Sequence, residues 1–597
     1  MKKVIITGIL CLFIYSFSFF VKKADNPTTA LNALSMTVPH VISEKNDADL
    51  WLVKGRVVNA DIRVPQLNGY NSNPELSNQL TATEDRSPKI RLGGYRNKKI
   101  ELYGHDRTKL VTERTKTTAS SKNGSTVVFD AGGQLENMNN TDGGLFVPAD
   151  SHGAAGPNHV MNAINASIEA YNKNGGGGVS TSLQSFFSPL FPVNATFDPK
   201  IIYDQFSQRW LVVTLERTDT SQGDPSNTSR VLLAVSENSD PNGLWNMVGI
   251  DTKLNIAGID YWFDYPGIAV DEEAIYLTGN MFEFGQGGGV GSRLWIFEKS
   301  SFYAGGGLFG FGPLDPFVVT NGINVTSQPA HVFGSTPNNF GTYLTGYSTL
   351  TDGTNEFWQT IRIDNPLTSP LFTLEFTNIG DVESSASSLP EAPQAGSSTN
   401  TGSNLTLATN DSRALNAVWM NNKLYSTAMV QSNQELGQTS ASWVMINADG
   451  VNATSPGQFG VIFGEQIANN TFTFFPSIAV NSAGVVGLGY SASASNIFAG
   501  SYFSYRMPGD AVNTMRAPQL IRQGEDFYNR TFGGSTNRWG DYSATTLDPV
   551  NDCFWVYNKH ATTRGFTTGQ DDDGMFGTSH GRICVDNTDV IFSNGFE

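Results

Sequence analysis

Short apolar stretches separated by turns recur along the chain from Val160 to Tyr557. Each copy has a Gly or Pro, an apolar strand, a turn and a second apolar or aromatic strand. The first strands read HVMNAIN, KIIYD, GIAVD, AHVFG, ALNAVWM, SIAVN and SATTLD, and their partners read SIEAY, RWLVVT, AIYLTG, TYLTGY, KLYSTA, VVGLGY and CFWVY. A unit of this kind buries its apolar face only against neighbouring copies. The pattern therefore predicts seven units of one repeat architecture.

The spacing of these units is that of propeller blades. A four-stranded blade takes ~40 to 50 residues, and the longer units here carry loop insertions between their second and third strands. Helix-length amphipathic patterns are nearly absent, while 61 Gly and 11% aromatic residues are typical of short strands joined by turns. We expect an all-β fold, a seven-bladed β-propeller of four-stranded antiparallel blades over residues 121–587, preceded by an irregular N-terminal segment. The first strands are expected to begin near Val160, Ile201, Ile268, Val332, Leu415, Ile478 and Ala544.

The seventh unit lacks a fourth strand, because only a tail follows its third strand at Arg582 to Val585. An open outer strand would invite pairing with other chains. The strand-like stretch from Ser125 to Asp130 is the candidate to close this blade. Cys553 and Cys584 would then lie on adjacent strands of the closing blade, and two cysteines in an exported chain predict a disulfide.

The N-terminus has the pattern of an export signal. Met1-Lys2-Lys3 precedes an uninterrupted apolar run, so residues 1–20 are expected to be a signal peptide, with a retained anchor as the alternative. Residues 21–120 read as a leader, a pro-segment or a loosely ordered module, and residues 588–597 as a C-terminal tail. We expect a monomeric protein that is secreted, or periplasmic or extracellular in a bacterial envelope.

The net charge of −17 argues against nucleic acid as a partner, because such binding relies on Lys and Arg that neutralise phosphate. Membrane contact is expected only if the N-terminal segment is retained. The expected partners are an extracellular glycan, a peptide or a cell-surface partner.

Carboxylates stand just ahead of several first strands. Asp198, Asp264 and Asp541 have this position, and Asp150 has a looser equivalent before the first unit. In a propeller these residues share a face with the loops between strands two and three. A ring of carboxylates can hold a cation, bind a polar ligand or act as acid and base. The alternative is that these residues only cap turns, as Asp often does.

Aromatic residues and an arginine stand beside these carboxylates. Aromatic rings next to hydrogen-bonding groups suit sugars and peptides, although they also pack one blade on the next. The residues predicted to bind a ligand on this face are Asp198, Asp264, Asp541, Trp262, Tyr265, Arg538, Trp539 and Tyr542.

Three consecutive carboxylates, Asp571, Asp572 and Asp573, precede Gly574 in a long loop of the closing unit. They are candidate ligands for Ca²⁺, but the distal Glu of an EF-hand is missing, so a solvated acidic loop is the alternative. No cofactor is required by the sequence, and Ca²⁺ is the one ion that these carboxylates suggest.

Several blocks together resemble a group of exported, largely uncharacterised bacterial β-propeller proteins. The blocks are GAAGPNHVMNAINASIEAYNKNG, DPKIIYDQFSQRWLVV, SENSDPNGLW, DYPGIAVDEEAIYLTGNMF and NRWGDYSATTLDPVNDCFWVYNK. The resemblance spans about Asp150 to Val585, and RWGDYS is its most specific part. It implies a propeller and secretion but no reaction. The tail that ends in IFSNGFE is similar to a short tail of many secreted gammaproteobacterial proteins.

The leading interpretation is a secreted binding protein, more non-enzymatic than enzymatic, that uses one propeller face for a carbohydrate, peptide or surface partner. The first alternative is a sialidase-like or other glycoside hydrolase with carboxylates as acid and base. The sialidase version is disfavoured because few arginines are available for a sugar carboxylate. The second alternative is a structural or adhesion protein of the cell surface, since propellers host many unrelated functions.

Overall fold

The computed structural model describes a β-propeller of seven sheets, within the compact unit that spans residues 38–597. The described residues are 51–52, 58–61, 117–121, 124–130 and 148–585, the last range with gaps at 166, 175–178, 195, 286–287, 317–325, 349–350, 384–388, 397–404, 433, 435–436, 449–455, 532–535 and 564–573. The triplet Asp571 to Asp573 therefore lies outside the described residues, as do the expected signal and the tail.

The first four blades follow one another along the chain. Blade one contains β5 (His152–Ala155), β6 (His159–Ile164), β7 (Ser167–Asn172) and β8 (Val179–Ser182). Blade two contains β9 (Thr196–Asp204), β10 (Arg209–Thr218), β11 (Thr228–Ser236) and β12 (Leu244–Asp251). Blade three contains β13 (Leu254–Ile256), β14 (Ile259–Val270), β15 (Ala274–Glu283), β16 (Gly289–Glu298) and β17 (Phe309–Leu314). Blade four contains β18 (Gln328–Pro329), β20 (Phe340–Gly346), β21 (Glu356–Asp364) and β22 (Leu371–Gly380).

The remaining blades complete the ring. Blade five contains β19 (His331–Phe333), β24 (Asn416–Met420), β25 (Lys423–Val430), β26 (Ser440–Asn447) and β27 (Pro456–Val461). Blade six contains β28 (Phe472–Val480), β29 (Val486–Ala494), β30 (Ile497–Arg506) and β31 (Gln519–Arg522). Blade seven contains β33 (Ala544–Leu547), β34 (Phe554–Thr563), β35 (Met575–Cys584), β4 (Gly124–Asp130) and β3 (Thr117–Ser121). Outside the blades lie the strand pair β23 (Thr406–Leu407) and β32 (Thr536–Asn537), and the short helices α3 (Leu183–Phe186), η2 (Ser188–Leu190), α4 (Lys299–Tyr303) and η3 (Gly464–Gln466).

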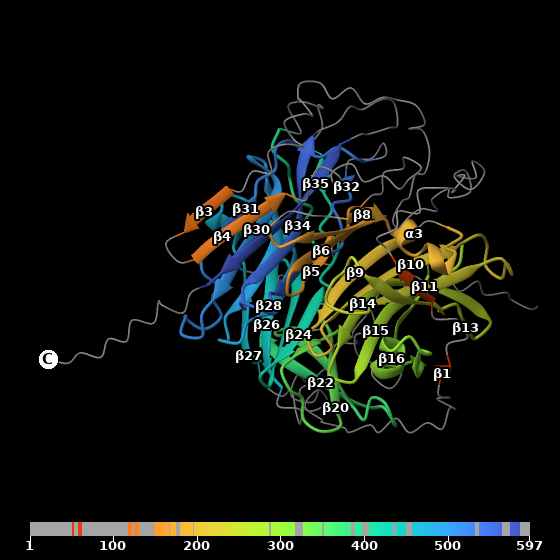
Figure 1. The fold of residues 1–597 in the computed structure, drawn as a ribbon. Coiled ribbons are helices and arrows are strands. Elements are labelled where there is room, and N and C mark those ends of the chain that lie inside the picture. Colours follow the sequence, from red (N-terminus) through yellow and green to blue (C-terminus); the bar gives the residue numbers. More distant parts are fainter. Residues whose placement is uncertain are drawn as a thin grey trace, which may run out of the picture. The chain divides into compact units, whose positions relative to one another are not determined.

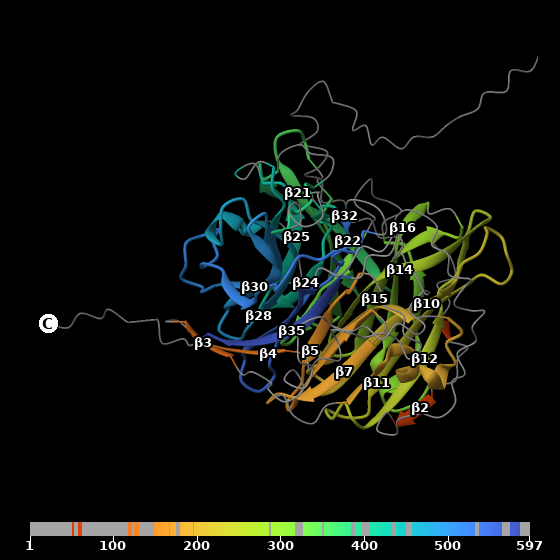
Figure 2. The same cartoon turned by 90° about the horizontal axis from the view of Figure 1, so that it is seen from above.

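The ring closes through a strand from the N-terminal side, as predicted. β4 pairs antiparallel with β35 from Asp130 opposite Ser579 to Ser125 opposite Cys584. Figures 1 and 2 show the orange β4 beside the blue β35. The predicted disulfide joins Cys553 to Cys584, with a Cα separation of 4.4 Å. The last blade thus combines the two ends of the repeat region, and a covalent bond ties its second and third strands.

Segments ahead of residue 121 also join the sheets. β1 (Trp51–Leu52) pairs with β17 at the outer edge of blade three, and β2 (Val58–Asp61) pairs with β12 at the outer edge of blade two. β3 extends the edge of blade seven beyond β4. Added strands of this kind cover sheet edges that would otherwise be open.

Two predicted first strands differ from the observed ones. The strand that contains Val160 is the second of blade one, because Val160 pairs with Ala155 of the short β5, whose HGAA sequence shows no apolar alternation. In blade four the innermost strand is only β18, and the following β19 pairs in parallel with β24 of blade five. β18 ends at Pro329, which has no N–H to donate, and only Ala330 separates the two pairings.

Local chemistry explains the strands and their turns. Asn421 and Asn422 both have positive φ, 51° and 60°, so a two-residue turn of the primed type joins β24 to β25. Nine tryptophans are among the largest fully buried side chains, and they pack within and between the blades.

No helix in the described part of the chain is long and apolar enough to cross a membrane.

Candidate functional site

The central axis has two unlike ends. We call the end where the chain approaches the innermost strands the closed end, which contains Asp150, Asp198, Asp264, Asn410 and Asp541. We call the other end, at the turns between strands one and two, the open end. Thr196 at the start of β9 pairs with Glu216 near the end of β10, so the long loop that follows β10 lies at the closed end. The carboxylates ahead of the innermost strands therefore share a face with this loop, as the sequence predicts.

A left-handed residue recurs near the start of the innermost strands. Non-glycine residues adopt this conformation at a cost of ~1 to 3 kcal/mol, and it concentrates at functional or tightly constrained positions. One such residue precedes the innermost strand or lies within it in six blades, with φ between 47° and 57°: Asp150, Asp198, Tyr265, Thr326, Asn410 and Phe475. In β14 and β28 this residue lies where the strand pairing changes register. Gly540, with φ +143°, has the corresponding place in blade seven. The chain therefore makes a similar turn at each approach to the axis.

Three hydrogen bonds at the closed end join blades that are not neighbours. Tyr542 of blade seven donates its hydroxyl to Asp198 Oδ2 of blade two at 2.9 Å, and Tyr265 of blade three donates to the backbone oxygen of Asp541 at 3.2 Å. Asn410 Nδ2, ahead of blade five, donates to Asp541 Oδ1. Blades that are not adjacent touch only across the axis of a propeller. Side chains therefore fill the axis at this end.

Asp150 links blades one, two and seven at the same end. Its Oδ1 accepts from the backbone N–H of Asp541 at 2.7 Å, and its Oδ2 accepts from Asn165 Nδ2 at 2.5 Å. The Asn165 Oδ1 in turn accepts from the backbone N–H of Asp198 at 2.6 Å. The carboxylates that the sequence placed at one height are thus brought together, with Asp150 as a full member.

Burial and mutual repulsion change the acidity of this group. Burial raises the pKa of Asp150 to about 6, with the charge of Asp541 adding to the effect. Burial also raises the pKa of Asp264 to about 6, although Arg217 opposes the shift. The pKa of Asp198 lies well above its ordinary value because of burial and the neighbouring Asp264 and Asp150 charges. Asp264 Oδ1 is buried without a hydrogen-bond partner among the described residues.

Cations stand between and beside these carboxylates. Arg538 contacts Asp541 at 3.2 Å, and the buried Lys559 donates to the backbone oxygen of Tyr542 at 3.0 Å. Burial lowers the pKa of Lys559 to about 8, while the nearby Asp150 and Asp541 act against that shift. Opposite charges are therefore enclosed together, which offsets part of their desolvation cost.

The predicted aromatic residues lie in the interior. Trp262, Tyr265, Trp539 and Tyr542 are each at most 5% exposed. The Arg217 guanidinium stacks 3.6 Å from the centre of the Trp262 ring, and Trp539 donates its indole N–H to a serine hydroxyl at 3.1 Å. These rings make the blade packing that was the alternative interpretation, and they form no open platform.

Among the described residues, no group of three or more His, Cys, Asp or Glu side chains has a metal-binding arrangement. Ca²⁺ at the closed end or at Asp571 to Asp573 therefore stays a prediction.

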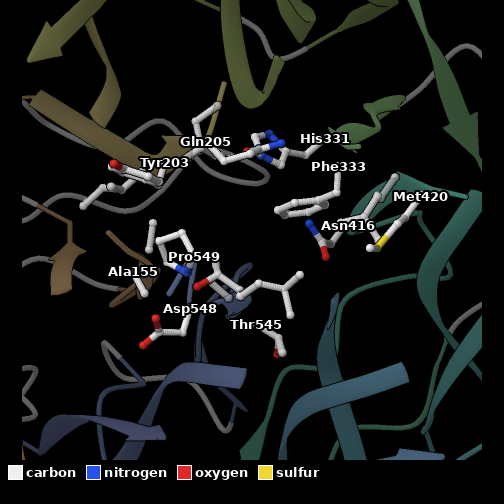
Figure 3. A pocket seen from close by; sticks show the side chains of 18 of the residues that line it. Ala155, Tyr203, Gln205, His331, Phe333, Asn416, Met420, Thr545, Asp548 and Pro549 are labelled. Atoms are coloured by element: carbon white, nitrogen blue, oxygen red, sulfur yellow. Dashed lines mark hydrogen bonds between the residues drawn. The ribbon is translucent and has the colours of Figure 1, made fainter. Parts of the chain in front are cut away.

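A cavity of about 410 Å³ lies at the open end of the axis. Figure 3 shows Tyr203 and Gln205 along one side of it and Phe333, Asn416 and Met420 along another. Innermost strands of blades one, two, three, five and seven and the β18 to β19 segment contribute to its wall, which is mostly apolar and aromatic. Its volume falls within the range of pockets for small molecules, ~300 to 1,000 Å³.

The carboxylates at the open end are occupied by turns and neighbours. Asp204, Asp271 and Asp548 each accept backbone N–H groups two or three residues further along the chain. These three residues are the Asp residues that end the motifs KIIYD, GIAVD and SATTLD. The sequence suggested turn capping for the carboxylates of the closed end, but in the structure the Asp residues of the open end have this role. Asp548 also binds Lys173 at 2.6 Å and the Trp555 indole at 3.0 Å.

Sequence reasoning missed the polar residues in the wall of this cavity, which include His152, Lys200, Gln328 and Asn416. One signal was available for Lys200. When the motifs KIIYD, GIAVD, AHVFG and SIAVN are aligned, Lys200 takes the position of the small residues Gly267, Ala330 and Ser477. Lysine is almost never fully buried without a partner, so a lysine in an otherwise apolar innermost strand indicates a specific role.

No protein-family model matches the chain, and no curated protein matches it either. Solved structures that the chain matches include a protein of unknown function from Dyadobacter fermentans, at 10% identity and a TM-score of 0.34 over 65% of this chain and 94% of that chain. A glycosyl hydrolase from Bacteroides ovatus matches at 10% identity and a TM-score of 0.27, over 54% of this chain and 86% of that one. A Trypanosoma rangeli sialidase matches at 10% identity and a TM-score of 0.29, over 70% of this chain and 57% of the sialidase. With TM-scores below 0.5, these likenesses say nothing about the activity of this chain.

Proposed function

We propose that the protein is a binding protein whose ligand site is the axial cavity at the open end. The observation that carries this proposal is a cavity of about 410 Å³ with mostly apolar walls. Cross-axis hydrogen bonds occupy the other end of the axis, so the cavity is expected to admit its ligand from the open end. Apolar pockets with a few polar groups are the usual form of small-molecule sites.

The face differs from the one that the sequence suggested. The ligand approaches between the turns of strands one and two, where Val550 is 68% exposed and Pro549 lies at the wall. Exposed apolar groups at the rim of an apolar cavity favour a ligand with an apolar part. A glycan or peptide partner, expected from the sequence, stays an alternative for this protein's outer faces.

A neutral apolar dye, N-phenyl-1-naphthylamine, tests the proposal through its fluorescence rise on entering an apolar site. We expect saturable binding to the wild type and its loss in Met420→Trp, which fills the wall of the cavity. Val512→Trp is the matched control, because Val512 is 69% exposed and does not line the cavity. Equal dye binding by both tryptophan variants would exclude the cavity as the site.

A glycoside hydrolase is the second candidate, supported by the raised pKa of Asp150 and Asp264, since perturbed carboxyls are common in active sites. Against it, both carboxyls are buried by the contacts that fill the axis. Release of reducing sugar from a glycan panel by the wild type, with loss in Asp264→Asn, would favour this candidate over the first.

A further inference from the structure

The polar groups in the wall of the axial cavity are unequally satisfied. Hydrogen-bond donors there lack partners, while carboxylate acceptors near the rim are filled. Asp548 has the partners already described, and Asp552 accepts from the backbone N–H of Ser482 at 2.9 Å and from its hydroxyl at 2.6 Å. The chemistry of the missing partner can therefore be read from the donors.

Lys200 is the strongest of these donors. Its side chain is 96% buried and lines the cavity, and its Nζ makes no hydrogen bond or ion pair with any described residue. The Nζ lies 3.4 Å from the centre of the Tyr542 ring. Burial lowers the pKa of Lys200 to about 7, although Asp198, Asp150 and Asp541 raise it. A buried ammonium without a partner is costly, and an anionic ligand would remove that cost.

His152 presents a second donor to the same cavity. Its Nδ1 accepts from the backbone N–H of Ile201 at 3.2 Å. Burial, with the Lys200 charge as a smaller cause, holds the pKa of His152 well below its ordinary value, so the ring is neutral. A neutral ring that accepts at Nδ1 carries its proton on Nε2. That N–H has no partner in the described part of the chain.

Two amides add further donors. Gln328 Nε2 is buried without a partner among the described residues. Asn416 uses its Oδ1 to accept from Ile478 at 2.9 Å, which leaves its Nδ2 to the cavity (Figure 3). The cavity also has one acceptor without a partner. His331 Nε2 faces Gln205 Oε1 at 3.2 Å and therefore carries the proton, so the buried Nδ1 is an acceptor with no partner among the described residues.

The order of residues along the strands separates these groups by depth. In the aligned first strands, Lys200 stands nearest the closed end, Ile201 and His331 one position further, and Tyr203 and Phe333 two positions beyond them. The donors of Lys200 and His152 are thus deep, and the aromatic side chains lie toward the opening. The carboxylates of the closed end do not line the cavity, and Asp150 and Asp198 accept hydrogen bonds from Asp541 and Tyr542.

We infer that the cavity binds an organic carboxylate with an apolar body, its head group on Lys200, His152 and Gln328 and its body against the walls toward the open end. The volume of about 410 Å³, roughly that of fourteen liquid waters, accommodates a chain of about ten carbons. This inference rests on the proposed function and specifies its ligand class.

Displacement of N-phenyl-1-naphthylamine by three ten-carbon compounds tests the inference. Decanoate, decanamide and decylamine share an apolar body and differ in the charge of the head. We expect decanoate to displace the dye at a concentration at least tenfold lower than decanamide, and decylamine to be the weakest. Equal displacement by decanoate and decanamide would overturn the carboxylate assignment and leave the cavity as a ligand site.

Variants identify the groups responsible. Lys200→Met should abolish the preference for decanoate over decanamide, and Lys200→Arg should retain it. Lys253→Met should leave it unchanged, because Lys253 follows β12 at the closed end of blade two and does not line the cavity. Gln328→Leu gives a second measure if Lys200→Met does not fold, with an expected loss of three- to tenfold for decanoate alone. An undiminished preference in both Lys200→Met and Gln328→Leu would overturn the inference. Absence of dye binding to the wild type would instead contradict the proposed function.

Discussion

The two ends of the propeller axis are built from the same innermost strands, but one end is filled by side chains and the other contains a cavity. At the closed end, Asp150, Asp198 and Asp541 receive hydrogen bonds from groups of other blades, and side chains fill the axis. At the open end, apolar walls surround a cavity in which Lys200 has no hydrogen-bond partner among the described residues. The register of the repeat determines at which level along the axis a side chain lies. The contacts across the axis determine whether that side chain is held by hydrogen bonds within the protein or can bind a ligand.

The energetic consequences of the two ends also differ. Buried charges need their partners, because removing one partner of an enclosed set typically costs ~3 to 5 kcal/mol. The closed end should therefore dominate the pH dependence of stability, and the substitution of an exposed side chain at the rim of the open end should act on binding. The following predictions test this division, from the largest expected effect to the smallest.

Lys559→Met should destabilise the protein most. The substitution removes a buried ammonium near Asp150 and Asp541, with an expected loss of about 3 to 5 kcal/mol in the free energy of unfolding at pH 7.5. The loss should shrink at pH 5, because the Asp150 carboxyl, with a pKa of about 6, is then neutral. Denaturant unfolding at both pH values measures it, with Lys423→Met as the control. A loss that does not change with pH would contradict the electrostatic account.

The double variant Cys553→Ala/Cys584→Ala should lower the free energy of unfolding by about 3 to 4 kcal/mol, from the added entropy of an unfolded chain without its cross-link. The bond joins the two strands at the open end of blade seven, next to the turn of Asp548. Hydrogen exchange should therefore rise first in β34 and β35, while the closed end keeps its protection. Uniform loss of protection would show that the two ends do not unfold separately.

Asp264→Asn should stabilise the protein at alkaline pH. Burial raises the folded pKa of Asp264 from 3.8 to about 6, so the folded chain holds this proton more tightly than the unfolded chain. The resulting stability is complete below about pH 4 and is lost as the pH rises through 6. Asn carries no such penalty, so we expect a gain of about 3 kcal/mol at pH 8 and almost none near pH 4.

The opposite result for Asp264→Asn would be informative. A less stable variant at pH 8 would mean that the carboxylate charge is used, as it would be by a bound cation. Added Ca²⁺ should then raise the melting temperature of the wild type and not of Asp264→Asn, which tests the ion suggested by the sequence.

Val550→Ser should have the smallest effect, limited to the open end. The side chain is 68% exposed, so the free energy of unfolding should change by less than about 0.5 kcal/mol. Dye affinity should fall several-fold, because apolar area at the rim is lost. Titration of the variant and the wild type with N-phenyl-1-naphthylamine measures this. A large loss of stability with unchanged affinity would assign Val550 to the structure.

The sequence could predict the fold in unusual detail because its signals are local. Apolar strands and turns recur in each unit, and a missing strand after Val585 together with the stretch from Ser125 to Asp130 predicted how the ring closes. The prediction was wrong where the signal was weak, as in blade one, where β5 is too short and too poor in apolar residues to show a pattern. For the candidate site, register predicted that the carboxylates gather at one end, but it pointed to an open platform for aromatic residues that are buried.

Composition, repeat and cysteine spacing by themselves determined seven blades, their closing strand and the residues that share a height on the axis. Tertiary structure alone decided which end of the axis is filled, since the hydrogen bonds of Tyr542 to Asp198 and Tyr265 to Asp541 join residues 344 and 276 positions apart. It also decided that Lys200, His152 and Gln328 face one cavity. The physical reason is that strand periodicity is set by neighbours along the chain, whereas the satisfaction of a buried polar group depends on partners that only the closed ring brings within reach.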